Sequence, residues 1–448
     1  MNRLSFFFSA CSRLVLMGIF WIAVRLFYDV EFHGLEHVKG KRPSYFAMAH
    51  KRDLDPMVEV PSVLARQGWR ALAGDVYFAM RSDAFAPGFL GRVVMYPRWF
   101  SRVLRLLSLG SVLRFLGIRP LEDLHQRPAE MWIRDFIHAE GDMFARDVLT
   151  PAFLQQLAAA VDEDAAALGR QRLSRLLAWR YQAALQEFYS VDILQQQKHW
   201  HTKSNILSQL KQELTELRNW LARGGSVWGA PEGQLSPTGL NGRVTAILHR
   251  LLRSGSMATS IVPITIVYDF MTVKRARIFV DVAPSILYDP QHDPQQAAQE
   301  VNEQLRRAWL TSARFTCTQL ASGFLVRRSK AAVHIFTLSD LVTEIEQEAA
   351  RLAETGRHVD ERLLAHQPAR KLAASFMHYA ERRKLVYSRA HDLYEVASCD
   401  LAMEVRAGGT GYNKYPLAYA WNELQDMLQV QTPAESETVA LPSAQNAA

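Results

Sequence analysis

The chain has 448 residues, of which 49% are hydrophobic and 22% are charged. This composition excludes an intrinsically disordered chain, and the length suffices for one large domain with additions or for two ordinary domains. The formal net charge of +7 predicts an anionic partner: nucleic acid, an acidic lipid surface or a phosphorylated substrate.

An apolar run occupies the N-terminal segment, from Leu14 to Val24, between Arg13 and Arg25. The run is shorter than the roughly 20 residues that span a bilayer, and no small-x-small cleavage site follows it. We therefore interpret residues 1–30 as a helix that lies on or dips into the membrane face, with a plain buried helix as the alternative.

The three cysteines, Cys11, Cys317 and Cys399, are far apart and form no C-x-x-C pair. This spacing gives no disulfide framework and favours a reducing compartment. Together with the apolar N-terminal run, it predicts a membrane-associated protein on the cytoplasmic face.

The first predicted strands lead to a histidine. Residues 30–32 alternate like a short strand, and Tyr45–Ala49 is an apolar strand that ends at His50. Asp55 and Pro56 then have the residue types of a helix start. A histidine at the end of a strand and a carboxylate at the start of the next helix can meet across a tight turn.

The pair His50 and Asp55 has the residue types of a general-base site. The carboxylate can hold the imidazole in one tautomer and stabilise its charged form, so the imidazole can take a proton from a hydroxyl near neutral pH. Two alternatives stay open. Asp55 before Pro56 is also a good helix cap without a catalytic role, and Asp53 is a competing partner for the histidine.

Residues 91–120 contain six arginines and no acidic residue. Arg98, Arg102 and Arg105 are spaced to share one helical face beside aromatic residues and leucines, which suits a helix among anionic lipid headgroups. A solvated basic face over a leucine core is the alternative. Nucleic-acid binding is disfavoured because no recognised binding motif accompanies the arginines.

The rest of the chain alternates helices with strands and then becomes helical. Residues 124–203 read as nearly continuous helix, followed by an amphipathic helix at 205–222. Strands are predicted at residues 226–230, 261–268 and 277–282. Beyond about residue 330 the pattern is helical without clear strands. We therefore expect an α/β fold with a mixed sheet flanked by helices, a helical insertion at about 124–203 and a helical C-terminal region.

Three sequence blocks follow one another along the chain: His50-x4-Asp55, residues 227–233 with Pro-Glu-Gly at 231–233, and residues 261–264 with Val-Pro at 262–263. In this order they resemble the glycerolipid acyltransferase family, the glycerol-3-phosphate and 1-acylglycerol-3-phosphate acyltransferases. Residues 32–36 also look like the lead-in strand of that family. The resemblance covers roughly residues 31–120 and 205–285.

The resemblance implies roles for individual residues. His50 would be the base and Asp55 its orienting partner. Glu232 and Gly233 would lie at the acceptor-binding surface, and residues 262–263 would help to shape the site.

This chain departs from the family pattern where a phosphate would be bound. The family's third block continues with an arginine that helps to hold a phosphate, whereas this chain has Gln-Leu at 234–235. Arg243 is the candidate substitute. For the arginine of the family's second block, Arg119 is the candidate and Arg127 the rival. The insertion has no counterpart in the family, and it could cap the acyl site or bind a partner.

We expect an O-acyltransferase that moves a fatty acyl group from acyl-CoA or acyl-carrier-protein to a hydroxyl of a glycerolipid precursor such as glycerol-3-phosphate or lysophosphatidic acid. The expected partners are the thioester donor, an anionic membrane surface and a lipid or lipid-precursor acceptor, without nucleic acid. Two alternatives stay open. One is acyl transfer to a non-phosphate alcohol or an amine, and the other is a catalytically inactive membrane scaffold.

No cofactor beyond the thioester co-substrate is expected, because no nucleotide-binding loop follows a predicted strand. His33, Glu36 and His37 match a zinc-protease pattern, but Gly34 breaks the helix that such a site needs, so no metal is expected.

The expected division of the chain has four parts. They are a membrane-associated helix (1–30), an acyltransferase domain with its insertion (31–330), a helical C-terminal region (331–431) and a disordered tail (432–448).

Overall fold

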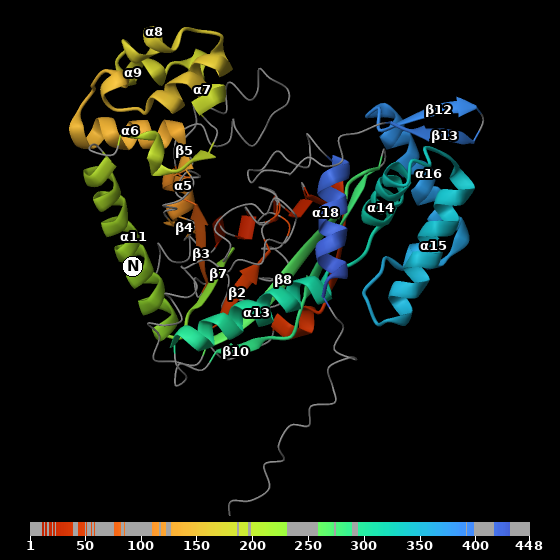
Figure 1. Ribbon diagram of the computed structural model, residues 1–448. Helices are drawn as coiled ribbons and strands as arrows, with labels where there is room; N and C mark the ends of the chain where they lie inside the picture. Colours follow the sequence, from red (N-terminus) through yellow and green to blue (C-terminus); the bar gives the residue numbers. More distant parts are fainter. Residues whose placement is uncertain are drawn as a thin grey trace, which may run out of the picture.

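An eight-stranded mixed sheet forms the centre of the molecule in the computed structural model (Figure 1). The structure describes residues 11–38 (apart from 13, 16, 17, 20 and 23), 44–49, 51, 55, 58, 76–81, 85, 110–115, 118–121, 127–185, 188–195, 199–230, 259–272, 275–288, 294–390, 392–397 and 416–430. Helices flank the sheet, so the predicted α/β class is confirmed.

The strands of the sheet follow the order β1-β9-β8-β2-β7-β3-β4, and β10 pairs with β8. They are β1 (Tyr28–His33), β2 (Ser44–Met48), β3 (Val76–Arg81), β4 (Ile118–Leu121), β7 (Ser226–Gly229), β8 (Thr259–Asp269), β9 (Ala276–Val282) and β10 (Ile286–Tyr288). Strands β8, β2, β7, β3 and β4 are parallel, whereas β9 and β10 run antiparallel to β8. The carboxyl ends of the five parallel strands therefore meet at one edge.

Strand β8 is long and almost entirely buried, as its sequence, rich in β-branched and apolar residues, predicts for a strand covered on both faces. Pro263 lies within it, although proline cannot donate to a sheet ladder. The carbonyl of Pro263 accepts the N–H of Ala283 at 3.0 Å. Its ring nitrogen points to the same side, where the chain passes from β9 to β10. The proline thus occupies the one interval in which β8 has no paired strand on that side.

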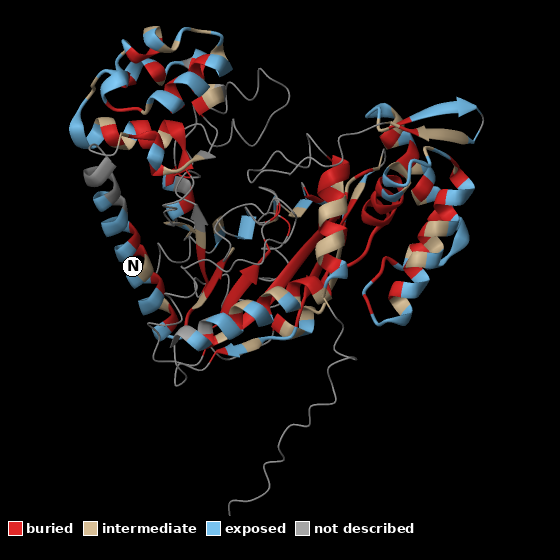
Figure 2. Ribbon diagram, in the orientation of Figure 1, coloured by how far each residue is buried: buried red, intermediate tan, exposed pale blue. Residues whose placement is uncertain are grey.

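Two hydrophobic cores cover the two faces of the sheet, because successive side chains of a strand point to opposite faces. On one face Tyr45 and Ala47 belong to a core shared with residues of six helices. On the other face Phe46 and Met48 pack with the facing residues of β7, β8 and β9. The helices that contribute to the first core are α11 (His199–Ala222), α13 (Pro294–Ser312), α14 (Cys317–Lys330), α15 (Leu338–Glu354), α16 (His366–Arg382) and α18 (Pro416–Leu428). Figure 2 shows the buried sheet and the exposed outer faces of these helices.

The C-terminal region contains strands that the sequence did not predict. Strands β11 (Ile335–Thr337), β13 (Leu393–Val396) and β12 (Val386–Ala390) form a small sheet in that order. Four of the five residues of β12 are exposed, so the strand lacks the apolar alternation that identifies a strand in sequence. The core of the first sheet face includes residues on both sides of the predicted boundary at residue 330, and the domain division stays a prediction.

The insertion is a separate helical unit rather than a nearly continuous helix. Its helices are α6 (Ala129–Glu140), α7 (Pro151–Val161), α8 (Ala165–Gly169), α9 (Leu173–Leu176) and α10 (Gln182–Leu185), with a two-stranded sheet of β5 (Arg127–Pro128) and β6 (Phe188–Tyr189). Thr150 and Asp164 cap two of these helices, accepting the N–H groups of Phe153 at 3.4 Å and Ala167 at 2.9 Å. These caps divide the predicted helix into short pieces.

The described part of residues 11–27 is helical. Val24 is buried, and the ring of Trp21 packs against that of Phe32 at 5.7 Å between centroids. Six apolar side chains of this helix are exposed: Leu14, Val15, Ile19, Ile22, Leu26 and Phe27. Among the described residues, no helix is both long enough and apolar enough to cross a membrane.

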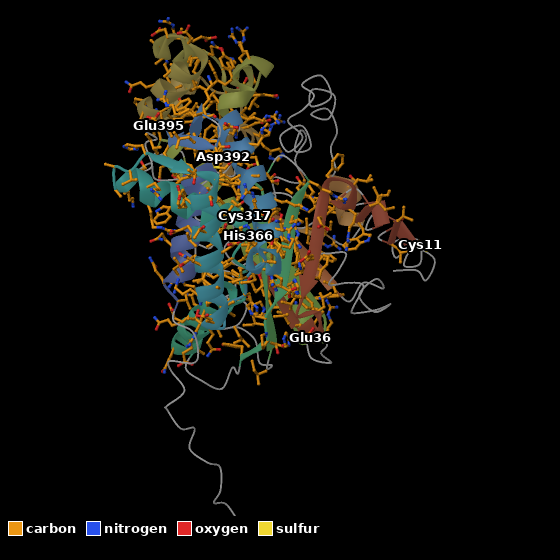
Figure 3. The ribbon with its side chains drawn as sticks, turned by 90° about the vertical axis from the view of Figure 1, so that its right-hand side faces the viewer. Cys11, Glu36, Cys317, His366, Asp392 and Glu395 are labelled. Carbon is orange, nitrogen blue, oxygen red and sulfur yellow. The ribbon has the colours of Figure 1, made fainter. Side chains whose placement is uncertain are left out.

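Two of the three cysteines are described, and both are free thiols. Cys11 is exposed at the outer edge of the molecule, whereas Cys317 is buried in its interior (Figure 3). Burial raises the pKa of the Cys317 thiol well above its ordinary value, so this thiol is chemically inert.

Candidate active site

The candidate site lies at the carboxyl end of β2, in the middle of the sheet. The chain leaves β2 towards β3 on one side, and it later passes from β7 to β8 on the other side. In open α/β sheets, ligands bind outside the carboxyl ends of the strands where the strand order turns in this way. The sequence motif His50-x4-Asp55 follows β2 directly.

Asp55 is completely buried at this end of the sheet. Its Oδ2 accepts the backbone N–H of Lys51 at 2.6 Å, and its Oδ1 accepts the hydroxyl of Tyr268 in β8. The first bond closes the turn that follows β2, and the second attaches the turn to the neighbouring strand. Both bonds have a charged acceptor and are therefore stronger than bonds between neutral groups.

His50 lies outside the described residues, as does its competing partner Asp53. The residues on both sides of His50 are described and buried. Ala49 donates its N–H to the carbonyl of Ile264 at 2.9 Å, and Lys51 is 2% exposed. The backbone is therefore held immediately before and after the predicted base.

A buried polar network extends from this turn to the C-terminal helices. The ammonium group of Lys51 donates to Oε1 of Glu423 in α18. The amide of Gln319 in α14 donates to Oε2 of the same carboxylate at 2.8 Å. The carbonyl oxygen of Gln319 accepts the N–H of Thr316 at 2.8 Å and its hydroxyl at 2.5 Å. Both oxygens of Glu423 are thus paired.

Two other buried carboxylates lie on the strands beside the site. Burial raises the pKa of Asp269, whose Oδ1 accepts the N–H and hydroxyl of Thr318 at 3.0 and 2.6 Å. Burial raises the pKa of Asp281 to about 6, although the guanidinium of Arg314 partly offsets this effect. In the hydrogen bonds described above, neither Asp269 nor Asp281 contacts Asp55, Lys51 or Glu423.

The acceptor-side residues Glu232, Gly233 and Arg243 all lie outside the described residues. Val262 and Pro263 are within β8, beside β2, and their role in shaping the site stays a prediction.

The structure does not bring Arg119 to Asp55. Arg119 is an exposed residue of β4, and β7 and β3 lie between β4 and β2. It pairs with Ala79 in register, so its side chain lies on the face of Tyr77 and α11, whereas Asp55 meets Tyr268 on the other face. Its role in substrate binding stays a prediction that this arrangement does not favour.

The rival Arg127 belongs to the insertion. It is buried in β5, its Nη1 lies 2.7 Å from a carboxylate oxygen of Asp135, and its guanidinium lies 4.9 Å from the ring centroid of Trp132. These contacts give Arg127 a structural role within the insertion. Arg98, Arg102 and Arg105 of the basic segment lie outside the described residues.

The sequence did not identify Lys51, Tyr268 or Glu423 as residues of the site. Tyr268 offered a signal, because a tyrosine inside a buried apolar strand needs a hydrogen-bond partner for its hydroxyl. Glu423 offered none, since it lies 372 positions from Lys51 in the chain. The described residues hold no group of three or more side chains arranged to bind a metal ion.

No model of a known protein family matches this chain. A search of curated proteins finds no match either.

Proposed function

We propose that this protein is a membrane-associated O-acyltransferase that moves a fatty acyl group from acyl-CoA or acyl-carrier-protein to a hydroxyl of a glycerolipid precursor, such as glycerol-3-phosphate or lysophosphatidic acid. The observation that carries the proposal is the position of Asp55. Its carboxylate is buried at the carboxyl end of β2 and held by Lys51 and Tyr268, five positions after a histidine.

A fixed carboxylate suits the role of orienting a catalytic imidazole. An ionised carboxylate has about four acceptor sites, so the bonds to Lys51 and Tyr268 can fix Asp55 while it also binds His50. In the proposed reaction, His50 takes the proton of the acceptor hydroxyl, and the oxygen attacks the thioester carbonyl. The C–S bond then breaks, the leaving thiolate receives the proton that His50 took, which returns His50 to its neutral form, and no covalent acyl-enzyme forms.

The acceptor class is the open part of this proposal. Arg119 lies three strands from β2, and Arg127 is bound within the insertion. Both were candidates for holding an acceptor phosphate. Their positions, together with Gln-Leu at 234–235 where the family has an arginine, favour acyl transfer to a non-phosphate alcohol or an amine as the second candidate function. Arg243, the remaining candidate, lies outside the described residues.

The assay uses purified protein in detergent with labelled acyl-CoA or acyl-carrier-protein and a panel of acceptors: glycerol-3-phosphate, lysophosphatidic acid, a monoacylglycerol and a long-chain amine. We expect acylation of glycerol-3-phosphate or lysophosphatidic acid by the wild type and its loss in His50→Ala. Acylation of the monoacylglycerol or the amine, without acylation of either phosphate-bearing acceptor, would select the second candidate. A wild type that acylates nothing, or a His50→Ala variant with full activity, would contradict the enzymatic proposal and favour an inactive scaffold.

The N-terminal helix supports the membrane association. Its exposed side chains at Val15, Ile19, Ile22 and Leu26 recur at helical spacing, so they form one apolar stripe, and Arg25 beside Trp21 adds a cation at its edge. A stripe of this kind inserts into the headgroup region of anionic membranes.

Vesicle flotation tests this surface. We expect Ile19→Asp combined with Ile22→Asp to reduce flotation with anionic vesicles, whereas Val333→Asp, at an exposed apolar residue of the C-terminal region, leaves flotation unchanged. Equal flotation of the wild type and the double variant would place the membrane contact elsewhere.

A further inference from the structure

We propose that Lys51 and Glu423 are positioning residues, whose buried ion pair attaches the turn carrying His50 and Asp55 to helix α18. This inference rests on the proposed function. It gives the C-terminal region a role in the site, which neither the sequence blocks nor their resemblance assigns.

The contacts of Lys51 link the two parts of the molecule. Its backbone N–H donates to Asp55 at 2.6 Å, and its ammonium group donates to Glu423. The same residue thus holds the orienting carboxylate through its main chain and α18 through its side chain. A displacement of α18 would move Lys51, and with it both His50, its neighbour in the chain, and Asp55.

Helix α18 is itself closely held. Gly323 of α14 lies against it, and a Cβ at this glycine would come within 2.6 Å of Leu424 and 3.5 Å of Trp421. The absence of a side chain at Gly323 therefore permits close packing of the two helices. Gln319 of α14 also holds Glu423, so α14 fixes both the backbone of α18 and its carboxylate.

The burial of this ion pair argues for a role beyond stability. The side chains of Lys51 and Glu423 are 0% and 2% exposed. Moving two charges out of water costs several kcal/mol per ion, and apolar residues of similar volume often stabilise a fold as well or better. A buried lysine paired with a carboxylate adds a positional restraint, since its bond to that carboxylate fixes the position of the backbone that carries the lysine.

The test is a double-mutant cycle with Lys51→Met, Glu423→Leu and the combination of both. Each single variant leaves one buried charge unpaired, and the double variant leaves none. We expect all three to lower kcat by about 10- to 100-fold, because small displacements of catalytic groups cost about that much, while KM for the donor changes less than about threefold. The double variant should regain the thermal stability that the single variants lose.

Arg277→Met is the matched control. It breaks another buried ion pair, in which Arg277 Nη1 lies 2.7 Å from a carboxylate oxygen of Asp360 and the side chains are 11% and 2% exposed. Asp29 and Glu31 also contact this arginine, and none of these residues contacts the turn after β2 in the bonds described. We expect Arg277→Met to lose stability with kcat within about twofold of the wild type.

Amide hydrogen exchange supplies a measurement that needs no substrate. Peptides covering residues 44–58 should exchange faster in all three cycle variants than in the wild type or Arg277→Met, because the turn loses its attachment. Wild-type kcat in the folded double variant, or an equal loss of kcat in Arg277→Met, would overturn the positioning role. Unchanged exchange at residues 44–58 would overturn the positioning role whether or not the wild type has acyltransferase activity. A lack of acyltransferase activity in the wild type would by itself contradict only the proposed function.

Discussion

The insertion and the C-terminal region both add helices to the sheet, but they relate to it differently. All buried apolar residues of the insertion core come from residues 129–194. The C-terminal helices instead share one core with Tyr45, Ala47 and Val267 of the sheet. In Figure 1 the two regions lie on opposite sides of the molecule, with the sheet between them.

This difference indicates which of the two regions belongs to the same structural unit as the candidate site. A region that buries its own core can open without exposing the sheet. A region that shares the core cannot, because its departure would expose the part of that core that continues through α14 to the sheet. The buried ion pair between Lys51 and Glu423 adds a polar link to the shared core. We therefore treat the C-terminal helices as part of the body that carries the candidate site and the insertion as an attached unit.

The largest expected effects come from removing one large core side chain in each region. Phe376 in α16 and Trp132 in α6 are both 0% exposed. Phe376→Ala and Trp132→Ala should each cost about 3–5 kcal/mol. Hydrogen exchange should show Phe376→Ala lowering the protection of β2 and β8, and Trp132→Ala lowering that of residues 129–194 only. A loss of protection in β8 caused by Trp132→Ala would mean that the insertion and the sheet unfold together.

The second-largest expected effect is a difference between the sheet and the insertion in how their stability depends on pH. Burial raises the pKa of Asp281 in β9 from 3.8 to about 6. Because the folded state keeps this proton up to about pH 6 while the unfolded chain releases it near pH 4, stability falls as the pH rises between these values. The fall amounts to about 3 kcal/mol, at 1.36 kcal/mol per pKa unit. We expect Asp281→Asn to flatten this slope in denaturant titrations, and an unchanged slope would contradict the assignment.

Asp142 of the insertion should behave in the opposite sense. Hydrogen bonds from the side chain and backbone of Ser174 lower the pKa of Asp142 below its ordinary value of 3.8. Its contribution is therefore present above that value and is lost as the pH falls through the lowered pKa. Asp142→Asn should weaken the protection of the insertion at neutral pH and leave it unchanged at the lowest pH values.

A smaller effect is expected when one buried tyrosine hydroxyl is removed from the sheet and one from the insertion. Tyr268→Phe removes the hydroxyl that donates to Asp55, and Tyr181→Phe removes one that donates to Glu163 of the insertion at 3.0 Å. Each bond has a charged acceptor, so each variant should lose about 2 kcal/mol of stability. Only Tyr268→Phe should lower kcat, by about tenfold, in the acyl-transfer assay. Equal kcat in both variants would remove Tyr268 from the site.

The sequence predicted the centre of the molecule better than its periphery. Strands β2 and β8 are buried on both faces, so their apolar runs were visible in the sequence, and Asp55 followed from its place after β2. The small sheet of β11, β12 and β13 has too few apolar residues to be seen. The breaks in the insertion depend on caps such as Thr150 and Asp164, which resemble ordinary polar residues of a long helix.

The partners of Asp55 and Lys51 could not be read from the sequence, for a physical reason. Tyr268 and Glu423 reach the turn after β2 only because the sheet order and the packing of α18 on α14 bring them there. Long-range pairs of this kind leave no local periodicity. Glu423 in particular looks like a polar residue of an amphipathic helix until the fold shows that it is 2% exposed.

The central claim is that Asp55, fixed at the end of β2, orients His50 as the base. Its most direct test is the kcat of acyl transfer in His50→Ala, Asp55→Asn and the variant with both changes. We predict that each single variant loses about 10³- to 10⁴-fold and that the double variant loses no more, since the two residues act as a unit. An Asp55→Asn variant that keeps more than about a tenth of wild-type kcat, or a double variant whose loss is the product of the single losses, would contradict the claim.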